Sequence, residues 1–198
     1  MQDIRVGFAM CGSFCTFSEV IPQMKQLVHS GAKVQPILSP NAFATDTRFG
    51  KASDFAAEIE EICQAKIIST IAAAEPIGPK KLLDLLIIAP CTGNTLGKLA
   101  NGVFDTSVTL AAKAHLRNQR PLLIAVSTND ALTGSAKNIG LLLNQKHLYF
   151  VPMAQDDPYH KPASVVARFD LILPAAEAAL KGEQLQPVLL GSKEEQKP

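Results

Sequence analysis

The sequence lacks three features that would point to a nucleic acid, a membrane or secretion. Its 19 basic side chains are nearly balanced by 18 acidic ones, and the resulting net charge of +1 gives no reason to expect a polyanionic partner. No stretch approaches the roughly 20 apolar residues of a membrane span. The first ten residues, MQDIRVGFAM, have too short an apolar run for a signal peptide. We therefore expect a cytoplasmic protein.

Cysteine is scarce and poorly spaced for metal binding. The four cysteines, at positions 11, 15, 63 and 91, form no CxxC pair and have no histidine nearby at ligand spacing. This pattern argues against a zinc site and against a disulfide framework. We expect no metal site, and thiols that stay reduced.

Two nucleotide-binding motifs are also missing. No GxGxxG follows the first apolar stretch, and GxxxxGK[ST] occurs nowhere in the chain. The first motif brings a dinucleotide pyrophosphate close to a helix N-terminus, and the second cradles the phosphates of a nucleoside triphosphate. These ligands are excluded, whereas a mononucleotide remains open.

What the chain does contain is an alternation of apolar runs with helical spacing. Strands are predicted at residues 4–10, 33–38, 66–69, 83–90, 121–126 and 147–151, and helices at 16–31, 54–64 and 163–181. Thr16 and Glu19 have the form of a capping box, and Pro174 interrupts the last helix. This order predicts an α/β fold, a three-layer doubly wound parallel sheet. We expect one domain over residues 1–190 and a flexible tail over 191–198.

Polar residues follow most of the predicted strands. The loops are residues 11–13, 39–41, 91–95, 127–130 and 153–156, and four of the five carry hydroxyl groups. Ligands of open α/β sheets bind at the carboxyl ends of the strands, where hydroxyls and free amides can hold a phosphate or a polar heterocycle. A phosphorylated ligand is predicted, although each loop taken alone is also typical of ordinary helix capping.

The stretch APCTGNTLGKLANGVFD resembles the signature of the flavoprotein family, which includes cysteine decarboxylases and flavin prenyltransferases and has a Rossmann-like fold. Residues at the matching positions are Pro90, Asn94, Thr95, Lys98, Gly102 and Asp105. The resemblance implies FMN, with Gly12, Ser13 and Ser39 at its phosphate. It places Thr92, Gly93, Asn94 and Thr95 against the flavin ring, with Asn94 near its reactive edge, and it implies that Cys91 and Ser127 also bind the cofactor. It also implies a homo-oligomer.

The chain departs from the decarboxylases of this family. No histidine lies between His29 and His115, and residues 127–130 read STND where those enzymes have a Pro-x-Met-Asn motif. Thiol decarboxylation is therefore not expected. The segment 159–162, YHKP, with Arg168 resembles the allylic phosphate clamp of the prenyltransferases at a shorter spacing, which keeps prenyl transfer as an alternative.

The segments GSFCTFSEVIPQM, TDTRFG, EPIGPKK, VSTNDAL and YFVPMAQDDP are similar to one branch of this family. Its members form one half of a two-component oxidoreductase. The likeness implies oxidation of a dihydropyridine dicarboxylate during sporulation. It also implies a separate partner protein, which binds a nicotinamide nucleotide, NAD(P).

A dianionic substrate needs cations nearby, because burying two carboxylates without counter-charge is costly. Arg48, Lys161 and Arg168 are the candidate substrate-binding residues, and Asn94, Lys98 and His160 are the candidate catalytic residues. His160 lies among polar residues. It is either a proton carrier, because the ordinary pKa of histidine is near neutral, or simply a surface residue. The thiols of residues 11 and 91 are either nucleophiles beside a helix start or small packing residues.

Two classes of function stay open at this point. One is an enzyme component that binds FMN or a related phosphorylated ligand and takes part in the oxidation. The other is an assembly or regulatory component that has kept the pocket and lost the catalytic histidine of its relatives. The intact turn at residues 92–95 favours the first, and the missing histidine favours the second.

The substitution Asn94→Asp tests whether the turn binds the ligand. It places a negative charge beside the ring, so we expect weaker FMN binding in a protein that still folds. Fluorescence titration with FMN measures the affinity, and circular dichroism checks the fold. Unchanged affinity would mean that the ligand binds elsewhere.

Overall fold

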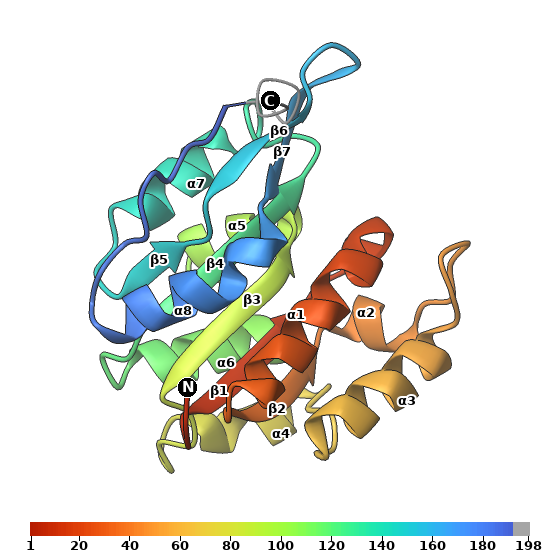
Figure 1. The fold of residues 1–198 in the computed structure, drawn as a ribbon, viewed down its shortest axis with the longest axis vertical. Coiled ribbons are helices and arrows are strands. Elements are labelled where there is room, and N and C mark those ends of the chain that lie inside the picture. Colours follow the sequence, from red (N-terminus) through yellow and green to blue (C-terminus); the bar gives the residue numbers. More distant parts are fainter. Residues whose placement is uncertain (192–198) are drawn as a thin grey trace.

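The computed structural model describes residues 1–191, which form a mostly parallel seven-stranded sheet between helices (Figure 1). The strand order is β2-β1-β3-β4-β7-β6, and β5 also pairs with β4. The strands are β1 Arg5–Met10, β2 Lys33–Leu38, β3 Leu85–Cys91, β4 Leu122–Thr128, β5 Leu148–Phe150, β6 Met153–Asp157 and β7 Lys161–Ala167. The first five run parallel, which confirms the predicted fold class.

Helices cover both faces of the sheet (Figure 1). They are α1 Phe17–His29, α2 Pro40–Ala44, α3 Ala52–Cys63, α4 Ile71–Ala74, α5 Gly93–Ala100, α6 Ser107–Leu116, α7 Ala136–Leu143 and α8 Ile172–Leu180. Short 3-10 turns lie at Phe14–Thr16, Glu75–Ile77 and Phe169–Leu171. Apolar side chains of α1, α3 and α8 form one core cluster, and those of α4 to α7 form the other.

Strand β3 is the centre of the sheet and is buried along its whole length. Leu85, Ile87 and Ala89 belong to the core cluster of α1 and α8. Leu86 and Ile88 point the other way, into the cluster of α5 and α6. An apolar run without alternation is what a parallel strand covered on both faces requires. The same run is what predicts the strand from sequence.

The predicted helix at 163–181 is wrong in its first half. Residues 161–167 form strand β7, which pairs antiparallel with β6, and a regular helix begins only at Ile172. The β-branched pair Val165 and Val166 favours extended backbone, and β5 pairs only with the first half of β4. Ser127 and Thr128 in the second half of β4 are therefore free to pair with β7. The polar loop predicted at 153–156 is strand β6.

Two smaller predictions also need correction. Thr16 precedes α1, but its hydroxyl donates to the carbonyl oxygen of Ser13 at 2.8 Å, so the expected capping box with Glu19 does not form. Residues 66–69 form no regular strand, and only Ile68 makes a bridge to Ile37. This single bridge extends the sheet beyond β2 at one position.

Residues 1–191 contain no helix that is both long enough and apolar enough to cross a membrane. The tail predicted at 191–198 lies, from residue 192 onward, outside the described residues.

Buried His115 should make folding sensitive to acid. It is 1% exposed on α6, and its Nε2 donates to the carbonyl oxygen of Pro121 at 2.9 Å. Burial lowers the pKa of His115 from 6.5 to about 4. Between these values the unfolded chain binds a proton that the folded chain excludes. The free energy of unfolding should therefore fall by about 3 kcal/mol as the pH drops through this window.

Urea unfolding at several pH values measures this loss. His115→Gln should flatten the dependence between pH 6.5 and 4. An equally steep dependence in His115→Gln would show that another group causes it.

Candidate functional site

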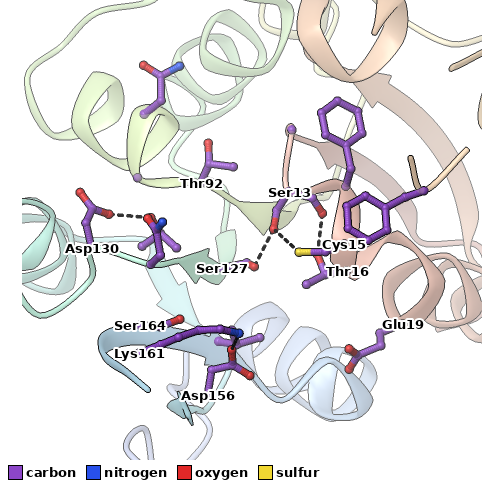
Figure 2. Close-up of a pocket in the computed structure, with 18 residues that line it drawn as sticks. Ser13, Cys15, Thr16, Glu19, Thr92, Ser127, Asp130, Asp156, Lys161 and Ser164 are labelled. Carbon is purple, nitrogen blue, oxygen red and sulfur yellow. Dashed lines mark hydrogen bonds and ion pairs between the residues drawn. The ribbon is translucent and has the colours of Figure 1, made fainter. Parts of the chain in front are cut away.

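A polar cleft of about 790 Å³ lies at the carboxyl ends of β1, β3 and β4, and Figure 2 shows its lining. This is the edge at which ligands of open α/β sheets bind. The lining residues are Gly12, Ser13, Phe14, Cys15, Thr16, Glu19, Phe49, Thr92, Gly93, Asn94, Ser127, Thr128, Asn129, Asp130, Asp156, Lys161, Ser164 and Val166.

The loop after β1 is joined to the end of β4 by a hydrogen bond between two serine hydroxyls. The Oγ atoms of Ser13 and Ser127 are 2.9 Å apart (Figure 2). Thr16, at the start of α1, holds the carbonyl oxygen of Ser13. Residues 114 positions apart in the chain thus form one wall of hydroxyl groups. Such a wall can donate or accept hydrogen bonds without bringing a fixed charge.

The second wall is the start of α5. Thr92 is the N-cap residue, but its side chain does not cap the helix. Gly93 follows it and lies close against the loop after β4: a methyl group on Gly93 would come within 2.7 Å of both Asp130 Oδ1 and Ser135 Oγ. Only glycine lets α5 start this near to that loop.

Asp130 is held firmly beside this helix start. The hydroxyl of Thr128 donates to its Oδ1 at 2.6 Å, and the hydroxyl of Ser135 lies 2.9 Å from Oδ1 and 3.0 Å from Oδ2. The N–H groups of Thr133 and Ser135 both donate to its carbonyl oxygen. The carboxylate is therefore a fixed part of the cleft.

The charged groups that line the cleft are mostly acidic. Glu19, Asp130 and Asp156 are carboxylates, and Lys161 is the one basic residue in the described lining. Lys161 Nζ lies 3.0 Å from Asp156 Oδ2, and this hydrogen bond raises the pKa of Lys161. Its charge is thus already matched by a protein carboxylate.

Half of the predicted site residues line this cleft. They are Gly12, Ser13, Thr92, Gly93, Asn94, Ser127 and Lys161, drawn from loops and strands far apart in the sequence. The other half do not line it: Ser39, Arg48, Cys91, Thr95, Lys98, His160 and Arg168.

Three of these outlying residues are buried and have partners in the fold. Ser39 Oγ caps α2 by accepting from the N–H of Ala42 at 3.2 Å. Thr95 donates to the sulfur of Cys11 at 3.2 Å. Burial raises the pKa of the Cys91 thiol well above its usual value, so this thiol stays protonated at neutral pH. Packing, the alternative raised for Cys91, accounts for its position.

Three of the outlying basic side chains contact residues outside the cleft lining. Lys98 Nζ lies 2.7 Å from Asp105, His160 Nδ1 lies 3.0 Å from Asp157, and a guanidinium nitrogen of Arg168 lies 3.1 Å from Asp170. His160 is exposed on the turn between β6 and β7. Arg48 stacks on Phe49, 4.8 Å from the ring centroid, and Phe49 in turn lines the cleft.

Several lining residues are not among the predicted site residues. Asn129, Asp130 and Asp156 lie in segments recognised as polar, but the sequence pattern assigns no role to their side chains. Ser164 and Val166 fall within the helix predicted at 163–181, so no site role was expected for them. They line the cleft because β7 pairs with β4. In residues 1–191, no three histidine, cysteine or acidic side chains gather where they could hold a metal ion.

Comparison with known proteins shows which family and which structures the chain resembles. The family model described as Flavoprotein matches residues 1–162. The B subunit of dipicolinate synthase from Bacillus subtilis (strain 168) is 45% identical over 186 residues, which are 94% of this chain and 93% of that protein. The crystal structure of the B subunit of dipicolinate synthase from Bacillus halodurans C has a TM-score of 0.88 at 45% identity, covering 96% and 98% of the two chains.

A more distant structure shares the fold alone. The FMN-dependent cysteine decarboxylase SpaF has a TM-score of 0.66 at 19% identity, with 90% of this chain and 97% of that chain covered.

The contact of Gly93 with the Asp130 loop gives a stability prediction. In Gly93→Ala the new methyl group meets two oxygen atoms at 2.7 Å, so α5 or the loop must shift, and we expect a loss of about 1–3 kcal/mol. Gly140→Ala is the matched control, because Gly140 lies inside α7 with nothing within 4 Å of the added methyl group. The control should gain up to about 1 kcal/mol. Thermal unfolding measures both, and equal effects would contradict the close packing.

Proposed function

The chain belongs to the flavoprotein family, and on that premise we propose that it serves as the B subunit of a dipicolinate synthase. In this role it contributes to the oxidation of dihydrodipicolinate to dipicolinate during sporulation, in the cytoplasm. The observation that carries the proposal is the 45% identity to the B subunit of a dipicolinate synthase over 94% of the chain, together with the polar cleft. The proposed partner is the A subunit of dipicolinate synthase, which would bind NAD(P).

The cleft has the size and the chemistry that FMN requires. Its volume of about 790 Å³ lies within the range of small-molecule sites. It offers hydroxyl donors from Ser13, Thr92 and Ser127, and the start of α5 forms part of its lining. Bound FMN would supply a two-electron acceptor for the oxidation of a dihydropyridine.

Different residues would bind the phosphate and the ring of FMN at the two ends of the cleft. Gly12 and Ser13 would hold the phosphate through backbone amides and a hydroxyl group. Thr92 and Asn94 would face the ring, and Ser127 would keep Ser13 in place through their 2.9 Å contact. Ser39, predicted at the phosphate, already caps α2 and is assigned no role in the cleft.

Charge distribution favours a shared rather than a complete active site. Dihydrodipicolinate carries two carboxylates, and the cleft offers three carboxylates against the single ammonium group of Lys161. Lys161 is itself matched by Asp156. Cations for the substrate would therefore come from the proposed partner protein, or from a second copy of this chain in the homo-oligomer that we also propose.

The same observation supports a second candidate function, a non-catalytic assembly or regulatory role. The basic side chain in the described lining, Lys161, is paired with a carboxylate of the protein. Such a cleft suits a protein that binds its ligand to stabilise the complex while the partner performs the oxidation. Prenyl transfer has less support. Of the clamp residues, Lys161 alone lines the cleft, Tyr159 is 82% exposed, and Arg168 borders a separate pocket beside α1.

Ser13→Ala distinguishes the catalytic role from the supporting role. Loss of a hydroxyl that contacts the phosphate should weaken FMN binding about tenfold to a hundredfold, as expected for one hydrogen bond to a charged group. Ser18→Ala is the control, since Ser18 is exposed on α1 outside the cleft. FMN affinity is measured by fluorescence titration, and dihydrodipicolinate oxidation is assayed with the partner protein at limiting FMN.

Parallel losses of affinity and of oxidation rate in Ser13→Ala would establish a flavin-dependent enzyme component. Weaker FMN binding with an unchanged rate would favour the supporting role. A wild-type protein that binds no FMN at any concentration would overturn the assignment of the cleft.

A further inference from the structure

We propose that Asp130 determines ligand specificity by excluding anions from the α5 end of the cleft. This inference rests on the proposed ligand cleft and assigns one of its ends to an uncharged, N–H-bearing part of the ligand. Figure 2 shows Asp130 at the side of the cleft opposite Ser13 and Cys15.

The first step is the position of the carboxylate. The start of an α-helix attracts anions, because its first N–H groups have no partner within the helix and its dipole is positive there. A carboxylate of the protein already lies beside the start of α5. Asp130 Oδ1 is so close to Gly93, the first residue of the helix, that it would touch a methyl group added there. A second anion at this point would face that charge.

The second step is that Asp130 cannot easily move aside. Its carboxylate is held by the hydroxyls of Thr128 and Ser135, and its backbone carbonyl by two N–H groups of the same loop. No basic side chain in the described cleft lining offsets it, since Lys161 is paired with Asp156. The repulsion of an incoming anion is thus built into the folded loop.

The third step concerns what this end can accept. An ionised carboxylate has about four lone-pair positions, and within residues 1–191 two hydroxyl groups donate to the carboxylate of Asp130. It can therefore accept a further hydrogen bond from an N–H group of a ligand. A neutral heterocycle with a ring N–H suits this end, whereas a phosphate or a substrate carboxylate must lie toward Gly12 and Ser13.

The test uses inorganic phosphate as the probe, so that it does not depend on flavin binding. Asp130→Asn removes the charge and keeps an acceptor oxygen. We expect its phosphate dissociation constant to fall about fivefold or more relative to wild type, measured by calorimetry. Asp130→Ser is the second uncharged variant, and the phosphate-induced rise in melting temperature, taken from each variant's own baseline, is the second readout.

Two further variants locate the effect. Glu177→Gln removes one negative charge at an exposed position on α8, outside the cleft lining, and its phosphate affinity should stay near that of wild type. The double variant D130N/N94D returns a carboxylate to the start of α5 and should lose the gain. An equal gain in Glu177→Gln, a gain that survives in the double variant, or no gain in either uncharged variant would overturn the inference.

A parallel FMN titration of the wild-type protein separates this inference from the proposed function. A gain in phosphate affinity without FMN binding by wild type would support the role of Asp130 and reject the flavin assignment. FMN binding by wild type with no gain in the uncharged variants would do the reverse.

Discussion

The architecture depends on one constraint, the complete burial of β3 between two layers of helices. A strand with neighbours on both sides and apolar cover on both faces satisfies its backbone hydrogen bonds within the sheet. Where β3 ends, at Cys91, the chain must turn into α5, and Thr92 and Gly93 start that helix directly beside the loop after β4. The cleft is the space left where β1, β3 and β4 all stop.

Charge pairing then decides what this cleft can hold. Hydroxyl groups line one wall, a fixed carboxylate lies at the start of α5, and the lysine that lines the cleft is paired across the β6–β7 hairpin. This arrangement suits a ligand that is largely uncharged and hydrogen-bonding, with its phosphate at the loop after β1. It does not suit a free dianion. The charges of the cleft are therefore compatible with a bound flavin. They are compatible with a dicarboxylate substrate as well if a partner protein helps to hold it.

Sequence alone was enough for the central sheet and for the loops that follow β1, β3 and β4, because buried parallel strands produce long apolar runs and the turns after them are polar. It failed for β7, where Ala163 to Ala167 have side chains compatible with both helix and strand. The extended form is stabilised by pairing with the second half of β4, a tertiary contact that the local sequence does not encode. The ion pairs of the candidate cations were not predicted, for a related reason: Lys98 pairs with Asp105 seven positions away, and Lys161 pairs with Asp156 across a hairpin that the sequence pattern did not predict.

The most direct test of the central claim is a crystal structure of the protein grown with saturating FMN. The account predicts flavin in the cleft, with its phosphate at Gly12 and Ser13 and its ring between Thr92 and Asp130. Flavin bound outside this cleft, or a cleft that stays empty at saturation, would contradict it.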